Sequence, residues 1–471
     1  MPRDRIVPLI IAVALFMENM DSTVIATSLP AIAADIGTNP LALKLAVTSY
    51  LLSLAVFIPV SGWTADRFGA RTVFRAAIAV FVMGSIGCAF SSSLTHFVIA
   101  RIVQGMGGAM MTPVGRMVLV RTISRRDLVA AMVWVTTPAL IGPVLGPPIG
   151  GFITTYATWH WIFIINVPIG LLGIALATRF IPDVRGKDTE RFDVVGMVLA
   201  GVGIAGMAFG LSVLGLNFLP WRVVAALIFG GACFFAAYIA HARHTQNPAL
   251  DLSLLRLPTF FASICGGFIF RLGLGALPFL LPLMLQIGFG MTPFESGMIT
   301  FASALGAMGM KWATASILRW FGFRNILVAN AIISSAFLAA CAAFTVATPI
   351  ALIVLVLLVG GFFRSLQFTS INTIAYAEVE QHRVSRATAL TSVAQQLAVS
   401  SGVALGATVV ELTVYFEGEP LQASHFPPAF LIVAAVSAFS ALIFARLPKE
   451  AGAEMADRLP TPTETSDQRT G

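Results

Sequence analysis

Two carboxylates, Glu18 and Asp21, lie near the middle of an apolar stretch that runs from residue 7 to residue 29. A stretch of this length predicts a membrane-spanning helix. An ionisable side chain inside a membrane is costly and marks a functional site by default. Because a spacing of three places both acids on one helix face, they could share a cavity and carry protons or recognise charge. A structural pair, hydrogen-bonded to neighbouring helices, is the alternative.

The composition of the whole chain agrees with a membrane location. Of its 471 residues, 57% are hydrophobic and only 11% are charged, whereas soluble domains contain about 25% charged residues. Residues 128–178 and 325–363 contain no Asp, Glu, Lys or Arg. A span needs about 20 apolar residues, so such runs hold more than one helix. The chain is therefore predicted to be an all-α integral membrane protein.

The apolar segments predict 14 transmembrane helices. These cover residues 7–29, 44–63, 73–92, 97–119, 129–153, 161–181, 194–214, 221–240, 259–283, 296–318, 326–345, 350–373, 388–412 and 427–446. With this count, most of the 29 lysines and arginines fall in loops on the side of the N-terminus. Basic loops stay in the cytoplasm, so both termini are predicted to be cytoplasmic. The net charge of +7 then marks a membrane face, and no nucleic-acid partner is expected.

The loop after the second span combines glycines with charges. It contains Gly62, Asp66, Arg67, Gly69 and Arg71. The glycines permit a tight turn, and the carboxylate can pair with either arginine. Such a cluster could hold two helix bundles together in one state and release them in another. An ordinary positively charged hairpin is the alternative.

An arginine is predicted inside the fourth span. Arg101 is followed by Gln104, and a guanidinium in a membrane needs a carboxylate or carbonyl partner. The intramembrane acids of this half are Glu18 and Asp21, and contact with Arg101 would change the proton affinity of such an acid. Alternatively, Arg101 lies near an interface and reaches water.

The fifth span is rich in glycine and proline. Gly142, Gly146 and Gly150 repeat every four residues, with Pro147 and Gly151 among them. This spacing makes a smooth face against which another helix can pack closely. Such a helix could rock against its partner and seal one route through the protein. Plain small-residue packing is the alternative.

Basic residues also occur within or near spans of the C-terminal half. Arg271, Lys311 and Arg364 lie there, with Gln367 and Asn372 close to the last of them. Basic residues in a cavity suit anionic substrates, although Lys311 could simply reach the membrane edge. The six histidines are scattered without metal-ligand spacing, so no metal site and no enzyme are predicted.

A short repeat links the two halves of the chain. Residues 68–71 read FGAR after the second span, and residues 321–324 read FGFR after the tenth. Repeats packed around a central site near the membrane midplane are the architecture of secondary transporters.

Several motifs in order resemble the signatures of one family. They are residues 20–30 (MDSTVIATSLP), 62–71 (GWTADRFGAR), 101–105 (RIVQG), 142–151 (GPVLGPPIGG) and 159–170 (WHWIFIINVPIG). Over essentially its whole length, the chain resembles the fourteen-span drug:proton antiporter branch of the major facilitator superfamily.

This resemblance implies a fold of two six-helix bundles with two extra spans between them. The N-terminal bundle would comprise residues 1–181 and the C-terminal bundle residues 259–447. Residues 182–258 would form the two linking helices with cytoplasmic loops, and residues 448–471 a disordered cytoplasmic tail.

The resemblance also implies a function. The protein would export drugs or other small amphipathic compounds across the cell inner membrane by alternating access, as a monomer. It would exchange them for protons, without a cofactor. Asp21 would accept the proton, Arg101 would modulate it, and Glu18 would be a second proton site or a substrate contact. The residues expected to line a substrate cavity are Glu18, Gln104, Asn166, Arg271, Arg364, Gln367 and Asn372.

Two other functions remain open from the sequence. An antiporter of a dedicated metabolite, such as an organic acid or a metal chelate, is favoured by Arg271 and Arg364. A non-transporting membrane sensor or a membrane enzyme is a third hypothesis. It is weakened because no loop is long enough to fold as a readout domain.

Overall fold

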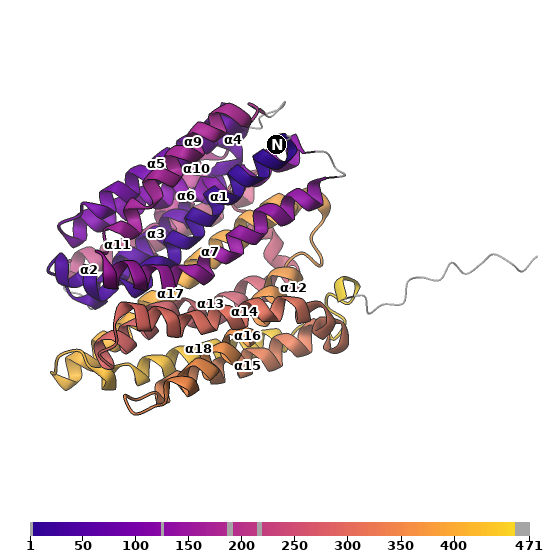
Figure 1. Ribbon diagram of the computed structural model, residues 1–471. Helices are drawn as coiled ribbons and strands as arrows, with labels where there is room; N and C mark the ends of the chain where they lie inside the picture. Colours follow the sequence, from indigo (N-terminus) through magenta and orange to yellow (C-terminus); the bar gives the residue numbers. More distant parts are fainter. Residues whose placement is uncertain (1–2, 124–126, 186–191, 214–218, 457–471) are drawn as a thin grey trace, which may run out of the picture.

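The computed structural model describes residues 3–123, 127–185, 192–213 and 219–456. Within these ranges every regular element is a helix. The predicted loop residues 186–191 and the last part of the predicted tail, residues 457–471, lie outside the described residues. Figure 1 shows two groups of helices side by side, one formed by the first half of the chain and one by the second.

The first group of helices comes from residues 3–180, where α1 packs along α7, α5 along α6, and α3 against α6. Its elements are α1 (Arg3–Val24), α2 (Leu29–Asp35), α3 (Lys44–Phe57), α4 (Ser61–Phe68), α5 (Ala70–Ala89), α6 (Leu94–Thr122), α7 (Leu128–Tyr156), α8 (Trp161–Ile164) and α9 (Asn166–Phe180), with 3-10 segments η1 (Ile25–Thr27), η2 (Pro40–Leu43) and η3 (Ile58–Val60).

The second predicted span is interrupted. Instead of one helix over residues 44–63, α3 ends at Phe57 and is followed by η3 and then α4. Pro59 lies in this break. Proline lacks a backbone N–H and clashes with the preceding turn, which favours a break in the regular helix at this point.

The second group comes from residues 252–456, where α14 packs along α16 and α13 along α17. Its elements are η4 (Leu252–Arg256), α12 (Pro258–Phe261), η5 (Ala262–Gly266), α13 (Gly267–Leu283), η6 (Met284–Gly288), α14 (Pro293–Phe321), α15 (Phe323–Ala340), η7 (Cys341–Ala343), α16 (Ile350–Ile374), η8 (Gln381–Arg383), α17 (Val384–Glu417), η9 (Ala423–His425), α18 (Pro427–Phe444) and η10 (Glu454–Ala456).

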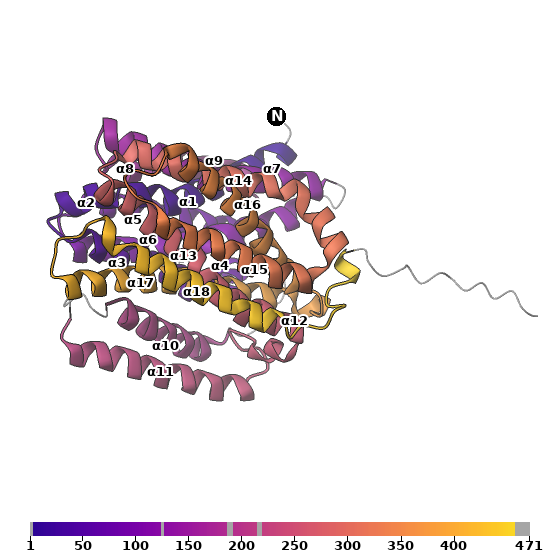
Figure 2. The same ribbon diagram turned by 90° about the horizontal axis from the view of Figure 1, so that it is seen from below.

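Two helices join the groups and lie to one side of them. They are α10 (Val194–Val213) and α11 (Trp221–His244), and they pack mainly on each other, with α10 also against α3 and α17. Figure 2 shows the pair at the periphery of the molecule. A side chain at Gly203 would overlap Phe235 of α11, so small residues permit the close approach of the two helices.

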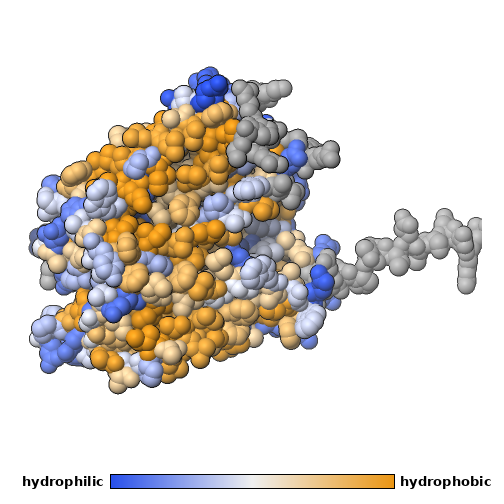
Figure 3. Space-filling view, in the orientation of Figure 1, coloured by the Kyte–Doolittle hydropathy of each residue, from blue (hydrophilic) through white to orange (hydrophobic). Residues whose placement is uncertain are grey.

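Thirteen helical segments of the described chain are long and apolar enough to cross a membrane. The predicted tenth span, residues 296–318, also forms a helix, α14, but it is not one of the thirteen. Length and hydropathy therefore do not confirm the predicted count of fourteen. In Figure 3 apolar residues cover the body of the molecule, and hydrophilic residues gather toward its two ends, as expected for a protein with a membrane belt.

The two groups meet along two pairs of helices, α7 with α14 and α3 with α17. Thr155 at the end of α7 accepts a hydrogen bond from the backbone N–H of Phe294 at the start of α14. Gln286 donates to the backbone carbonyl of Thr27, a bond of 2.9 Å that also crosses between the groups. These contacts lie at the ends of the helices that face away from the N-terminus of α1.

The short sequence repeat corresponds to a repeated structure. Gly69 separates α4 from α5 with a φ of 91°, and Gly322 separates α14 from α15 with a φ of 74°. Both values lie in the region that residues with a Cβ rarely adopt. The FGAR and FGFR segments thus make the same helix–turn–helix connection in the two halves.

Part of the segment predicted as a disordered tail is ordered. Residues 448–456 form turns and η10. Ala451 packs on the cluster that contains Phe323, and Gly452 lies close to that same ring. In Figure 1 this yellow segment and the N-terminal end of α1 lie at the same end of the molecule.

Candidate transport site

The Asp21 carboxylate lies at the centre of a buried polar cluster. Its Oδ2 accepts a hydrogen bond of 2.7 Å from Nη1 of Arg101. Its Oδ1 accepts one of 2.9 Å from Gln104 and one of 2.8 Å from Asn166. All four side chains are at most 1% exposed. The structure therefore brings together α1, α6 and α9 around one carboxylate, whose negative charge is met by a guanidinium and two amides.

The Arg101 guanidinium is enclosed by an aromatic ring and an amide. Its Cζ lies 4.2 Å from the centre of the Tyr50 ring, within the range of a cation–π interaction. Nη1 also donates to Oε1 of Gln104 at 2.6 Å. The Arg101 side chain does not reach the surrounding solvent, because only 1% of it is exposed. Of the two acids predicted as possible partners, Glu18 and Asp21, the structure pairs Arg101 with Asp21.

Sequence reasoning missed two members of this cluster, Ser85 and Tyr50. The Ser85 hydroxyl accepts hydrogen bonds from Gln104 at 2.7 Å and from Asn166 at 3.1 Å, and it fixes the orientation of both amides. Both residues are polar side chains within predicted spans. That signal is weak for a single serine or tyrosine, since hydroxyls in a membrane can bond to their own helix.

Glu18 lies in a different environment from Asp21. Its Oε2 accepts a hydrogen bond of 2.8 Å from Thr112 of α6, and its side chain lines a cavity of about 250 Å³. This smaller cavity is bounded by α1, α3, α13 and α17, and Arg101 lines it as well. The two acids, although three residues apart, therefore separate into one sealed carboxylate and one that faces a cavity.

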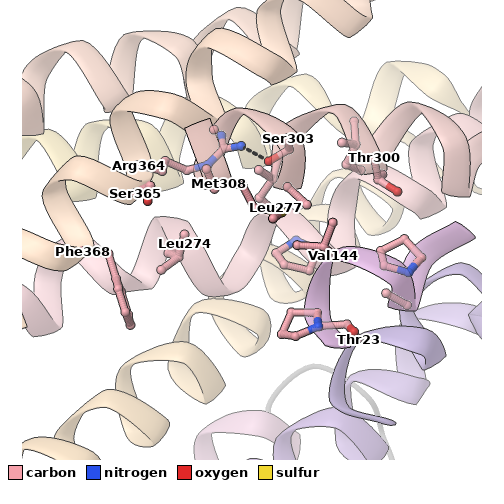
Figure 4. A pocket seen from close by; sticks show the side chains of 18 of the residues that line it. Thr23, Val144, Leu274, Leu277, Thr300, Ser303, Met308, Arg364, Ser365 and Phe368 are labelled. Atoms are coloured by element: carbon pink, nitrogen blue, oxygen red, sulfur yellow. Dashed lines mark hydrogen bonds between the residues drawn. The ribbon is translucent and has the colours of Figure 1, made fainter. Parts of the chain in front are cut away.

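A larger cavity, of about 530 Å³, lies between α1 and α7 on one side and α13, α14 and α16 on the other. Figure 4 shows Val144 and Thr23 on the first side and Arg364 with Ser303 on the second. Arg364 is 7% exposed and donates a hydrogen bond to Ser303. A cavity of this volume accommodates a small organic molecule.

The other polar residues predicted for a substrate cavity do not line either of these two cavities. Gln104 and Asn166 belong to the Asp21 cluster. Gln367 donates to the backbone carbonyl of Leu327 at 2.9 Å and is fully buried. Asn372 accepts a hydrogen bond of 2.7 Å from Arg271. Glu18 and Arg364 are thus the two predicted residues that line one or the other of these two cavities.

The predicted pairing within the loop after the second span is wrong. Asp66 pairs with neither Arg67 nor Arg71; its Oδ1 lies 2.7 Å from Nη2 of Arg121, at the end of α6. The carboxylate and the guanidinium are each about one-third exposed. Asp66 lies within α4, whereas Arg71 follows the turn at Gly69. The tertiary packing of α4 on α6 supplies a partner that spacing along the chain cannot indicate.

The glycines of the fifth span make the close helix contacts predicted for them. A Cβ on Gly150 would lie 2.3 Å from the backbone oxygen of Val24 on α1, and a Cβ on Gly151 would lie 2.3 Å from that of Pro293 on α14. Gly142 and Gly146 also face α1, and the carbonyl of Pro147 approaches Gly297 of α14. α7 is therefore packed on α1 within its own group and on α14 of the other group.

A buried ion pair between the two groups was not predicted. Lys44 at the start of α3 and Glu411 near the end of α17 form a salt bridge, and Lys44 is fully buried.

A membrane protein of two helix groups, with buried charges and cavities where the groups meet, has the architecture of a secondary transporter. The chain belongs to the Major Facilitator Superfamily, whose family model matches residues 11–403 and 266–463. It is a transporter and not an enzyme.

Relatives in Salmonella are 38% identical over 452 residues, which cover 94% of this chain and 94% of theirs. Those from strains of Salmonella heidelberg and Salmonella typhimurium both carry the name "Putative multidrug resistance protein MdtD". The likeness to MdtD agrees with the family resemblance of the sequence motifs.

Solved structures share the fold at low sequence identity. A D-xylose–proton symporter is 15% identical with a TM-score of 0.68, covering 95% of this chain and 98% of that one. A bacterial homologue of the human lysosomal transporter Spinster is 13% identical with a TM-score of 0.67, covering 98% and 99%.

Proposed function

We propose that this protein is a proton-coupled antiporter that exports small amphipathic compounds, drugs among them, across the cell inner membrane by alternating access. The observation that carries the proposal is the separation of the two acids of α1. Asp21 is sealed against Arg101, whereas Glu18 faces a cavity between the two helix groups. The name of the MdtD relatives supports drugs as substrates.

Asp21 is the proposed proton-coupling residue. A proton on its carboxylate would remove the negative charge that holds Arg101 and turn one oxygen from an acceptor into a donor. The bonds from Arg101, Gln104 and Asn166 would weaken, because their acceptor would no longer carry a charge. Because these residues tie α1 to α6 and α9, protonation would loosen the packing inside the first group.

Glu18 is the proposed contact for a second proton or for a positively charged substrate. Its neighbour Thr112 donates to it from α6, while its cavity is also lined by α13 and α17 of the other group. A change in the charge of Glu18 would therefore be felt at the boundary along which the two groups move. The protein would work as a monomer, with the proton gradient as its energy source.

The experiment that tests this function uses purified protein in liposomes with an imposed pH gradient, and ethidium as the probe. We expect the gradient to accelerate ethidium movement in the wild type, Asp21→Asn to abolish the acceleration, and Glu18→Gln to reduce it. Glu450→Gln is the matched control, since Glu450 is exposed after the last transmembrane helix. Failure of the gradient to accelerate ethidium or any other compound of a drug panel would refute antiport. Full coupling in Asp21→Asn would refute the assignment of Asp21.

A further inference from the structure

The guanidinium of Arg364 reaches the larger cavity without a carboxylate partner. The side chain extends from well inside α16 and is 7% exposed. Its hydrogen bond goes to the neutral hydroxyl of Ser303 on α14. No ion pair within the described part of the chain includes Arg364. A charge buried at membrane depth requires a compensating charge or dipole, and one neutral hydroxyl compensates little of the charge of the guanidinium.

Two further cations lie at or near the same cavity. Lys311 of α14 lines it and takes part in no ion pair among the described residues. Arg271 of α13 lies behind the Phe368 ring, which lines the cavity, with its Cζ 5.5 Å from the ring centre. Arg271 bonds to the neutral Asn372, and its Nε and Nη1 have no hydrogen-bond partner. The C-terminal side of the cavity is therefore positively charged.

Negative side chains are absent from the walls of this cavity as far as the structure describes them. Glu18 lines the smaller cavity and not the larger one, Asp21 is paired with Arg101, and Glu411 is paired with Lys44. Apart from the cations and a few hydroxyls, the walls are apolar side chains such as Val144, Leu277 and Phe368. The cavity thus combines an apolar interior with a concentrated positive charge at one side.

We propose that the larger cavity binds an amphipathic organic anion, whose acid group pairs with Arg364 and whose apolar part lies against Val144, Leu277 and Phe368. This inference rests on the proposed function and names the substrate class of the larger cavity only; Glu18 in the smaller cavity remains the proposed contact for positively charged substrates. A planar carboxylate can accept two parallel bonds from a guanidinium, which fixes its orientation as well as its charge. A cationic compound would be repelled by Arg364 and Lys311.

Equilibrium binding to the full-length protein in detergent, without any pH gradient, tests the proposal. The probes are three radiolabelled molecules that share a naphthyl group: naphthalene-1-acetate, its neutral amide and 1-naphthylmethylammonium. We expect the wild type to bind the carboxylate about tenfold or more tightly than the amide, and the ammonium more weakly still. Arg364→Gln should remove the preference for the carboxylate, and Arg364→Lys should retain part of it.

The control is Arg446→Gln, which removes an exposed arginine beyond α18 and should leave all three affinities unchanged. Equal binding of the carboxylate and the amide would overturn the proposal, and so would an unchanged preference in Arg364→Gln. If Arg364→Gln does not fold, Arg364→Lys decides, since a preference identical to the wild type would contradict the bidentate pairing.

Failure of the anion site and failure of antiport give different results in these experiments. If the carboxylate is bound preferentially but no gradient drives its transport, the cavity assignment stands and antiport fails. If a gradient drives the ammonium and not the carboxylate, antiport stands and the anion site fails.

Discussion

Nζ of Lys44 and Oε2 of Glu411 lie 2.7 Å apart and join α3 of the first helix group to α17 of the second. Thr408, one turn before Glu411, also accepts a hydrogen bond from the ammonium. The pair lies at the same end of the molecule as the bond between Thr155 and Phe294. The salt bridge between α3 and α17 and the contact between α7 and α14 therefore hold the two helix groups together at this end of the molecule.

Breaking this pair should destabilise the protein. Glu411→Gln leaves a buried ammonium without its counter-charge, and loss of one partner of a buried pair costs about 3–5 kcal/mol. We expect a marked fall in the melting temperature in detergent for Glu411→Gln and for Lys44→Gln. The exchanged variant Lys44→Glu with Glu411→Lys should recover part of the loss. Single variants as stable as the wild type would show that the pair contributes nothing.

The partner of Asp66 can be tested by comparing two arginines, Arg121 and Arg67. Asp66→Asn and Arg121→Gln should slow gradient-driven transport to a similar extent, because each removes the same bond between α4 and α6. Arg67→Gln should have a smaller effect. Since the pair is partly exposed, its loss should change stability by no more than about 1 kcal/mol. Transport rates in liposomes and thermal unfolding measure the two effects. A larger transport defect in Arg67→Gln than in Arg121→Gln would restore the pairing predicted from sequence.

Two glycines of the sequence motifs should respond differently to alanine. Gly151→Ala would place a methyl group 2.3 Å from the backbone oxygen of Pro293, which forces α7 and α14 apart. Overpacking of this kind costs about 1–3 kcal/mol, so both stability and transport should fall. Gly62→Ala meets no atom within 4 Å and should behave as the wild type. Thermal unfolding and ethidium transport measure both, and a tolerated Gly151→Ala would mean that the crossing is not tight.

Stability at low pH should depend on Asp251, in the connection between α11 and α12. Burial acts to raise its pKa, but hydrogen bonds from Ser253 and Arg383 and the charge of Arg383 outweigh it, so the pKa lies below the ordinary value of 3.8. A lowered carboxylate pKa stabilises the folded state above the unfolded pKa and loses this effect as pH falls through the folded pKa.

We therefore expect Asp251→Asn to lower the melting temperature at pH 7, and the difference from the wild type to shrink as the pH falls below about 4. Melting curves between pH 3 and pH 7 measure this. Asp35→Asn, which changes an acid that is about half exposed, is the control. A difference that grows as the pH falls would contradict the sign of the shift.

Sequence alone predicted where most of the helices lie and limited the partner of Arg101 to two acids, Glu18 and Asp21. Apolar length and the placement of basic residues identify spans because the membrane imposes both. Few charges lie within the spans of the first half, so each has few possible partners, and the choice of Asp21 over Glu18 followed from the family resemblance.

Contacts between distant, partly exposed elements were not predictable in the same way. Asp66 has several arginines near it along the chain, and only the packing of α4 on α6 selects Arg121. Lys44 and Glu411 were each consistent with a position near water, because sequence does not show which helix ends face one another. The separation of Glu18 from Asp21 also depends on helix rotation, since one helix face can border two different environments.

The lone guanidinium in the larger cavity has an electrical consequence. If its occupant leaves the cell with one negative charge while one proton enters, each cycle moves two elementary charges in the same sense across the membrane. Each charge gains about 2.3 kcal/mol per 100 mV of membrane potential. An inside-negative voltage would then drive export together with the pH difference. With a neutral occupant only the charge of the proton would cross, and the voltage would contribute half as much free energy to each cycle.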